Sequence, residues 1–493
     1  MALVETSYGR LRGARTDGVD VFKGIPFAKP PVGELRWRAP EPPAPWPGIR
    51  DAHEFGRCAI QSTIPGDVGE LIGIATGEVS EDCLYLNVWS PGLDDAKRPV
   101  MVWIHGGGNT VGAGSQPRVN GEHLARSGDV VVVTVNYRLG ALGFLHAPEL
   151  GATGNEALLD QVAALRWVRA EIAAFGGDPK NVTVFGQSAG GFDIAQLMAM
   201  PAAEGCFDKA VPMSGSLTEQ VTAAAGEATA VALARELTGG SFDRLRAVPA
   251  GDILAVQSRI PGARWAPTRD GVVLPEDART VLGEGRFTSG MPLLIGHTRD
   301  ESTLFTVFNE RFANMDREGL VALAREPFGE RAEQAAACYE SDRQEAGLPV
   351  EPLDLWAAIS TDRMFRLPAI RTAECHARHT PSVWMYRFDR ESPARDGRLQ
   401  ACHSLDIPFV WGTYALPAMQ RFCGRDDGVG RLSTRVMASY LAFARHGDPN
   451  NELTPDWPVY EPGRRATMLF DDDLGVADAP LDGIRAFCET EAA

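Results

Sequence analysis

The sequence NVTVFGQSAGG occupies residues 181–191 and combines a strand signal, a turn signal and a reactive side chain. The β-branched and aromatic run at 182–185 predicts a buried strand, and the segment GFDIAQLMAM from residue 191 onward can form a helix. Between them, residues 186–190 match the pattern G-x-S-x-G with Ser188 at its centre. A serine on a glycine-flanked turn between strand and helix is typical of a nucleophile elbow. The context favours a nucleophilic Ser188 over a merely structural turn.

Strand and helix signals alternate through the first half of the chain. Short runs rich in β-branched residues predict strands at 84–89, 100–104, 130–136, 210–213 and 291–295, and helical spacing predicts a helix over 157–175. Near-continuous apolar strands are typical of a sheet covered on both faces. We therefore expect an α/β fold with a doubly wound, mostly parallel sheet.

The segments outside this alternation fit a single domain spanning residues 1–493, since no internal repeat or linker divides the chain. Residues 3–15 and 19–27 are expected to form a hairpin, which leads into a Pro-rich surface segment. Ala-, Glu- and Arg-rich helical sequence at about 217–260 and 316–379 predicts insertions over the carboxyl ends of the strands. These insertions would form a cap that shapes a substrate pocket.

Composition excludes several classes of function. The 48 basic and 65 acidic residues are interspersed and give a net charge of −17, which argues against nucleic-acid binding. No apolar run approaches the length of a membrane span, and the first residues lack the pattern of a secretion signal, so a cytoplasmic protein is expected. Eight cysteines without a C-x-x-C pair do not suggest a zinc site, and neither a metal nor a cofactor is expected.

A second glycine-rich segment predicts an oxyanion hole. The sequence WIHGGG at 103–108 follows a predicted strand and offers free backbone N–H groups. Together with the residue after the nucleophile, this predicts oxyanion donors at Gly107, Gly108 and Ala189. The alternatives are a tight turn or a phosphate loop, but the G-K-[ST] ending of a phosphate loop is absent.

The general base is expected downstream of an acid, because the chain order in this fold class is serine, acid, histidine. Among the candidates, His376 and His379 end a helical run and are expected to face solvent or to cap it, and His446 precedes a helix end. His403 lies on a loop before the apolar SLDIPFVWG and is the preferred base. The predicted strand at 291–295 leads into Asp300 and Glu301, and spacing alone does not separate these two acids.

Seven segments in order resemble the type-B carboxylesterase and cholinesterase-like family: FKGIPFAKPPVGELRW, EDCLYLNVW, HGGG, NYRLGALGF, FGGDPKNVTVFGQSAGG, GHTRDE and HSLDIPFVWG. The resemblance covers nearly the whole chain. It implies an α/β-hydrolase fold and a catalytic triad of Ser188, Glu301 and His403. It also implies a disulfide between Cys58 and Cys83, which a reducing cytoplasm would keep as thiols.

The same resemblance implies further positions near the site. Arg36 with Glu81 and Arg138 with Asp160 match structural ion pairs of the family, and Ser214 matches a second serine near the triad.

Two neighbours of the site depart from the family pattern. Gln187 stands where cholinesterases carry Glu, and Asn109 replaces the aromatic residue that usually follows HGGG. The segment between Cys58 and Cys83 contains no aromatic residue, so choline esters are not the expected substrates.

The expected function is hydrolysis of small-molecule carboxylic esters through an acyl-enzyme on Ser188. An amidase or carbamate hydrolase with the same machinery is the first alternative. A non-catalytic binding protein is the second, and it is disfavoured because all three triad positions are filled.

Overall fold

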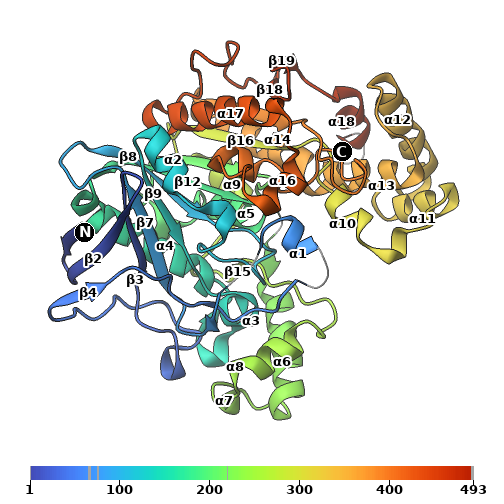
Figure 1. Cartoon of the computed structure of the whole chain (residues 1–493). Coiled ribbons are helices and arrows are strands. Elements are labelled where there is room, and N and C mark those ends of the chain that lie inside the picture. The colour runs from blue at the N-terminus through green and yellow to red at the C-terminus, as the bar shows by residue number, and fades with distance from the viewer. Residues whose placement is uncertain (1, 65–67, 75–76, 219, 490–493) are drawn as a thin grey trace.

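The computed structural model describes residues 2–64, 68–74, 77–218 and 220–489. Its main feature is a large sheet that runs through the molecule with helices on both sides (Figure 1). In spatial order its strands are β1 (Ala2–Thr6), β2 (Gly9–Thr16), β3 (Val19–Pro26), β7 (Tyr85–Ser90), β9 (Val131–Val135), β8 (Arg98–Ile104), β12 (Gly177–Gln187), β13 (Lys209–Met213), β16 (Leu293–Thr298), β17 (Val383–Phe388), β18 (Ala466–Phe470) and β19 (Gly475–Asp478).

The centre of this sheet is parallel, as predicted. Every neighbouring pair from β9 through β8 and β12 to β18 is parallel, whereas β3, β7 and the last strand β19 pair antiparallel with their neighbours. The predicted strands are confirmed, with ends shifted by a few residues. The N-terminal expectation needs correction: residues 3–15 already contain a hairpin of β1 and β2, and β3 adds a third antiparallel strand.

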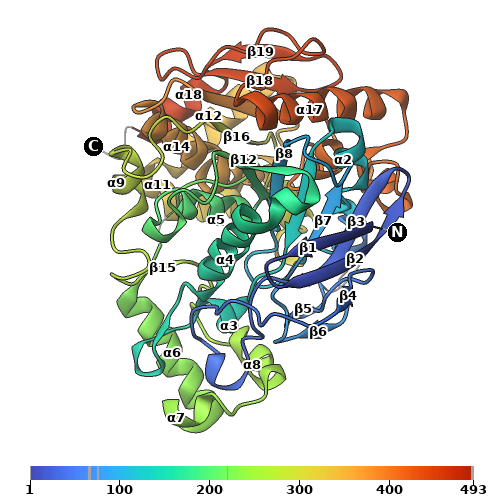
Figure 2. The same ribbon diagram turned by 90° about the vertical axis from the view of Figure 1, so that its left-hand side faces the viewer.

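Alternating side chains of the central strands point to opposite faces of the sheet and form part of two separate hydrophobic cores. Val100 and Val102 of β8 belong to a core that includes the helix α4 (Glu156–Glu171). Met101 and Trp103 point the other way, into a core with α17 (Asp427–His446). A strand buried on both faces needs apolar residues at every position, which explains the continuous hydrophobic runs in the sequence. Figure 2 shows α4 and α17 on different sides of the sheet.

The remaining elements are short strand pairs and helices around this frame. Of the short strands, β4 (Ile49–Asp51) extends the large sheet by pairing with β2. The separate pairs are β5 (Cys58–Ala59) with β6 (Val79–Ser80), β10 (His146–Ala147) with β11 (Ala152–Thr153), and β14 (Val221–Thr222) with β15 (Thr268–Arg269). The other helices of the frame are α1 (Val68–Leu71), α2 (Glu122–Gly128), α3 (Gly140–Phe144), α5 (Ala189–Leu197), α9 (Ala278–Gly283), α10 (Thr303–Val307), α15 (Ile407–Trp411), α16 (Pro417–Cys423) and α18 (Asp482–Glu489).

The two helical excursions expected from the sequence lie apart from each other (Figure 1). The first contains α6 (Ala223–Thr238), α7 (Phe242–Leu245) and α8 (Ala250–Gln257). The second contains α11 (Arg317–Phe328), α12 (Ala332–Glu345), α13 (Pro352–Thr361), a π-helical turn (Asp362–Arg366) and α14 (Leu367–Ala377). Across the described ranges, no helix is both long and apolar enough to cross a membrane.

Both implied ion pairs are present in the structure. Arg138 Nη2 lies 2.7 Å from Asp160 Oδ1, with both side chains buried, and Arg36 Nη2 lies 2.5 Å from Glu81 Oε2. The first pair joins the segment after β9 to helix α4.

The implied disulfide is absent from the structure, because Cys58 and Cys83 are both buried free cysteines. Cys58 Sγ instead contacts Ser115 Oγ at 3.5 Å. Burial raises the pKa of the Cys83 thiol well above its usual value, which keeps it protonated and unreactive.

Candidate active site

Ser188 lies on a sharp turn between β12 and α5. Its φ of 57° and ψ of −126° are unusual for a non-glycine residue, and its N–H donates to the Met213 carbonyl at 2.9 Å. A Cβ atom at either Gly186 or Gly190 would collide with the carbonyl oxygen of Ile104 on β8. The glycines of the motif are therefore required because a neighbouring strand passes directly against the turn.

His403 and Glu301 meet beside this turn. Glu301 follows β16 and is fully buried, and His403 Nδ1 forms a short hydrogen bond with its Oε2 atom. The backbone N–H of Thr298 donates to Glu301 Oε1 at 2.8 Å, which fixes the carboxylate. Burial raises the pKa of Glu301, but its electrostatic interaction and hydrogen bond with His403, together with Ser214 and His297, outweigh burial and lower the pKa below its usual value. The carboxylate is therefore ionised and holds the imidazole in one orientation.

Gln187 occupies the other side of the imidazole. Its Nε2 lies 3.0 Å from His403 Nε2, and its Oε1 accepts from Ser404 Oγ at 3.2 Å. An amide donor at Nε2 and a carboxylate at Nδ1 together specify the neutral tautomer that carries its proton on Nδ1. Within the described part of the chain, no hydrogen bond joins Ser188 Oγ to His403. The Gln187 amide therefore occupies His403 Nε2, the nitrogen through which the imidazole would accept a proton from Ser188 as a general base.

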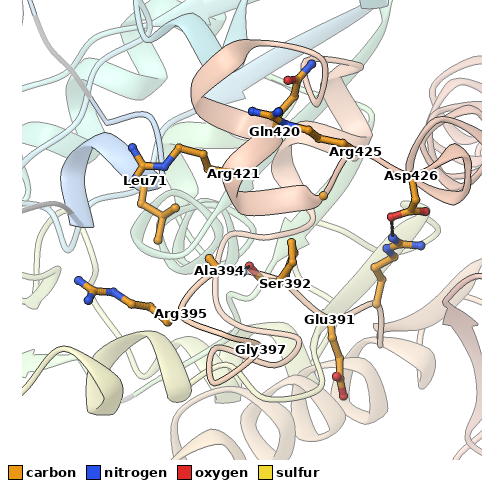
Figure 3. Close-up of a pocket in the computed structure, with 13 residues that line it drawn as sticks. Leu71, Glu391, Ser392, Ala394, Arg395, Gly397, Gln420, Arg421, Arg425 and Asp426 are labelled. Atoms are coloured by element: carbon orange, nitrogen blue, oxygen red, sulfur yellow. Dashed lines mark hydrogen bonds and ion pairs between the residues drawn. The ribbon is translucent and has the colours of Figure 1, made fainter.

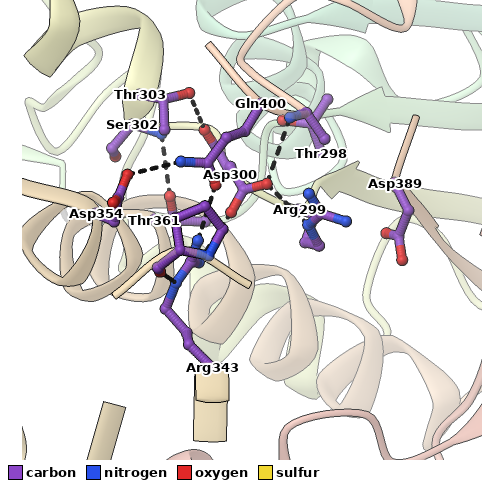
Figure 4. A network of polar contacts seen from close by, with 12 residues as sticks. Thr298, Arg299, Asp300, Ser302, Thr303, Arg343, Asp354, Thr361, Asp389 and Gln400 are labelled. Atoms are coloured by element: carbon purple, nitrogen blue, oxygen red, sulfur yellow. Dashed lines mark hydrogen bonds and ion pairs between the residues drawn. The ribbon is translucent and has the colours of Figure 1, made fainter. Parts of the chain in front are cut away.

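Asp300 and Glu301, which spacing left unresolved, have different surroundings, and Figure 4 shows those of Asp300. The Asp300 carboxylate accepts from Arg343 Nη1 at 3.0 Å and from Arg299 Nε at 2.8 Å. Its N–H donates to the carbonyl of Ala401 at 3.0 Å. Asp300 therefore ties the end of β16 to the loop that carries His403, whereas the Glu301 carboxylate contacts the imidazole itself.

Further polar contacts extend this network into the second helical excursion (Figure 4). Arg343 of α12 also donates to Gln400 Oε1 at 2.8 Å, and Gln400 Nε2 donates to Asp354 of α13 at 2.7 Å. The Ser302 N–H donates to Thr361 Oγ1, at the end of α13, at 3.0 Å. The loops that carry Glu301 and His403 are thus held by helices outside the sheet.

The glycine-rich loop after β8 faces Ser188. Gly107 has a φ of 121°, and its carbonyl accepts from the N–H groups of Thr110 and Val111 at 3.1 Å, which closes the loop. Over the described residues, the N–H groups of Gly107 and Gly108 have no acceptor. Ala189 is the first residue of α5, so its N–H has no partner within that helix. All three residues line the same pocket as Ser188 and His403.

Asn109 connects this loop to helix α5. Its Nδ2 donates to Asp193 Oδ1 of α5 at 3.2 Å, and Gln161 Nε2 donates to Asp193 Oδ2 at 2.6 Å. Burial raises the pKa of Asp193 to about 7, although the two amide donors act in the opposite direction. The carboxyl behind the loop therefore titrates near neutral pH.

Replacing Asp193 by Asn should change how stability depends on pH. A raised folded-state pKa means that the stability contributed by this group is complete below pH 3.8 and is lost as the pH rises to about 7. An amide does not titrate, so the difference in Tm between Asp193→Asn and the parent should become more favourable to the variant from pH 5 to pH 8. Thermal melts at each pH measure this difference. A constant difference over that range would contradict a buried, titrating carboxyl.

Ser214, implied by resemblance, is buried beside the acid. Its hydroxyl lowers the pKa of Glu301, although no well-aligned hydrogen-bond partner for Ser214 Oγ exists among the described residues. The other histidines lie elsewhere. His376 lies in the last turn of α14, as expected for the end of a helical run, but it is fully buried with Nε2 2.8 Å from the Met291 carbonyl oxygen and does not face solvent. His446 ends α17 ahead of the left-handed Gly447, as predicted.

Two aromatic rings beside the imidazole escaped sequence reasoning. The rings of Phe305 and Phe365 lie 5.1 and 5.0 Å from that of His403. Phe305 lies in α10 only four residues after Glu301, and this closeness in the chain could have revealed it. Phe365 comes from the π-helical turn far along the chain, and no local signal points to it.

The pocket that contains these groups has a volume of about 920 Å³. Apolar side chains of Ile72, Ile74, Leu304, Phe305 and Phe365 form much of its wall. Its size and mixed lining are typical of a small-molecule site. The described residues contain no cluster of His, Cys, Asp and Glu suited to a metal ion.

Comparisons with known proteins identify the family of this chain. The model of the Carboxylesterase family matches residues 1–481. Para-nitrobenzyl esterase of Bacillus subtilis (strain 168) is 40% identical over 492 residues, which cover 97% of this chain and 96% of the relative. Phenmedipham hydrolase of Pseudarthrobacter oxydans is 36% identical, with 96% and 95% covered.

Solved structures extend the likeness to the fold. A carboxylesterase structure from Geobacillus stearothermophilus superimposes with a TM-score of 0.87 at 39% identity and covers 98% of this chain and 99% of its own. The chain therefore belongs to the carboxylesterase family: it has the α/β-hydrolase fold and is a carboxylic ester hydrolase.

Proposed function

We propose that Ser188, His403 and Glu301 hydrolyse carboxylic esters through an acyl-enzyme intermediate. The observation that carries the proposal is the buried Glu301–His403 hydrogen bond at the base of a pocket that also contains Ser188. A carboxylate on Nδ1 leaves Nε2 as the basic nitrogen, which is what a serine nucleophile requires.

In the first step, Ser188 Oγ attacks the ester carbonyl carbon while His403 Nε2 takes the hydroxyl proton. The carbonyl oxygen becomes an oxyanion and accepts hydrogen bonds from the N–H groups of Gly107, Gly108 and Ala189. His403 then gives its proton to the departing alkoxide, and the acyl group remains on Ser188. Water repeats the sequence against the acyl carbon and releases the acid.

Gln187 adds a step before the attack. Its amide occupies His403 Nε2 in the resting structure, so Ser188 must replace it when the substrate is bound. The exchange trades one hydrogen bond for another, and Gln187 Oε1 keeps its contact with Ser404. Because the Gln187 amide is neutral, it exerts no net charge on the imidazolium that His403 becomes during catalysis.

We also propose that residues 1–493 form one domain, with 217–260 and 316–379 as cap segments. Pocket-lining residues from both segments support this assignment, among them Thr218 and Gln220 from the first and Phe365 and Pro368 from the second. The parts of these segments that reach the pocket lie close to the sheet.

Trapping the intermediate tests the mechanism. Para-nitrobenzyl and para-nitrophenyl esters are suitable first substrates, since the Bacillus subtilis relative is named for the former. Mixing the enzyme with a para-nitrophenyl ester, quenching in acid and digesting it should give a peptide with Ser188 heavier by one acyl group. Acylation at another residue, or turnover with no acylated Ser188, would contradict the proposal.

A matched ester and anilide of the same acid separate the alternatives. We expect the ester to be hydrolysed and the anilide to turn over far more slowly, because an amide carbonyl is less electrophilic than an ester carbonyl and an anilide anion is a poorer leaving group than a phenolate. Equal rates for the two substrates would favour the amidase alternative. Binding of both substrates without hydrolysis of either would favour a non-catalytic binding protein.

A further inference from the structure

The pocket that contains Ser188 has a cationic lining. Five arginines line it, Arg118, Arg264, Arg279, Arg363 and Arg371, and none of its described lining residues is Asp or Glu. The whole chain has the opposite balance, with 65 acidic against 48 basic residues. A cavity lined by one sign of charge concentrates ligands of the other sign.

Two of the five arginines, Arg279 and Arg371, are available to bind a ligand, whereas Arg118 and Arg363 already have partners. Arg118 is buried and donates to the Ile72 carbonyl at 2.8 Å, and Arg363 Nη1 lies 3.1 Å from Glu326 Oε2. Arg279 and Arg371, by contrast, have no ion pair with any residue that the structure describes.

Arg279 and Arg371 come from elements that pack together. Arg279 lies in the first turn of α9 and Arg371 in α14, and these two helices are in contact. Both residues are exposed, and they come from helices that carry neither Ser188, His403 nor the glycine-rich loop. The two arginines therefore belong to a solvent-accessible part of the pocket wall that is separate from the segments carrying Ser188 and His403.

We propose that this enzyme acts on esters that carry a carboxylate remote from the scissile carbonyl, and that Arg279 and Arg371 bind that carboxylate. The inference rests on the proposed function of Ser188 and names its substrate class. A guanidinium group matches a carboxylate with paired N–H donors, and it stays charged over the whole working pH range. The apolar side chains that line the same pocket suit a hydrocarbon spacer between the ester and the carboxylate.

A second arginine-lined pocket provides the matched control (Figure 3). It lies beside α16, and its Arg390 is neutralised by Asp426 and Asp472. Arg421 lines this pocket and is exposed. Arg421→Gln therefore removes the same unit of charge as Arg279→Gln without touching the pocket of Ser188.

The experiment compares kcat/KM for charged and neutral esters of similar size. The mono-para-nitrophenyl ester of glutarate places the anion on the acyl side, with para-nitrophenyl valerate as its neutral partner. The anion of 4-acetoxybenzoate lies on the leaving group, with 4-acetoxybenzamide as its partner. If the arginine variants change the charged-to-neutral ratio of kcat/KM for only one pair, that pair shows whether the carboxylate is bound on the acyl side or on the leaving-group side.

For the responding pair, Arg279→Gln and Arg371→Gln should each lower the charged-to-neutral ratio of kcat/KM by about three- to tenfold, since these hydrogen bonds to charge are partly solvent-exposed. Raising NaCl from about 0.05 to about 0.5 M should reduce the same ratio in the parent enzyme. Arg421→Gln should leave both rates unchanged.

Unchanged ratios in both arginine variants, or an equal effect of Arg421→Gln, would overturn the carboxylate site. The proposed function is tested separately by the parent enzyme on the valerate ester. Hydrolysis of that ester through Ser188 without any response to Arg279 or Arg371 would refute only the substrate class.

Discussion

Ser188→Ala is expected to lose about a millionfold in kcat on a para-nitrophenyl ester, the scale seen when a serine nucleophile is removed from a triad enzyme. The hydroxyl is the only group in the proposed mechanism that forms a bond to the substrate. Residual turnover would come from the N–H groups of Gly107, Gly108 and Ala189, which remain in place. Stopped-flow and long-term absorbance measurements together cover this range.

The matched control is Ser216→Ala. Ser216 is a fully buried serine that does not line the pocket, so its loss should change kcat by less than about threefold, within the usual effect of a small buried substitution. Both variants should keep the parent Tm within a few degrees, because alanine removes one oxygen and leaves the backbone unchanged. Near-parental activity in Ser188→Ala would refute the nucleophile.

Glu301→Gln should lower kcat by about ten-thousandfold, as expected when the group on the far side of a catalytic imidazole becomes an amide. The amide of glutamine can donate to His403 Nδ1, which would favour the tautomer with its proton on Nε2. That tautomer cannot accept the proton of Ser188. Rates measured from pH 6 to pH 9 should stay low throughout, because the defect is one of tautomer rather than of titration.

Asp300→Asn is the comparison that separates the two neighbouring acids. It weakens the contacts with Arg299 and Arg343, so Tm should fall while kcat drops by no more than about tenfold, the effect of a positioning residue that never touches the imidazole. A larger loss of kcat in Asp300→Asn than in Glu301→Gln would reverse the assignment of the acid.

Much of the fold could be predicted from the sequence because the central strands are buried on both faces. Their apolar runs at 100–104, 130–136 and 182–185 have no other simple explanation, and all three are strands. β17, β18 and β19 were not predicted. These strands complete the far edge of the sheet, and no motif marks them.

The local motifs predicted the turn at Ser188 and the loop at 107–108, since both depend on glycines that have to be adjacent in the chain. Contacts at the site between residues that are far apart in the chain were harder to predict. Spacing could not separate Asp300 from Glu301, because the distinction comes from Arg343, which lies 43 residues downstream of Asp300. The contact of Gln187 with His403 and the two phenylalanine rings are likewise products of packing.

The sequence also left open whether Cys58 and Cys83 are bonded, and both are free thiols in the structure. A family pattern gives the positions of Cys58 and Cys83, but the bond depends on geometry and redox conditions that the pattern does not contain.

The contacts of α12 and α13 with Asp300, Gln400 and Ser302 limit how far this enzyme can be miniaturised. None of the described pocket-lining residues belongs to α11, α12 or α13, so deleting residues 317–361 would appear harmless to substrate binding. The shortened chain would nevertheless lose Arg343 and Asp354, and their buried partners would be left without compensation. A compact version of this catalyst must therefore supply replacement partners for the segment that carries Glu301 and His403.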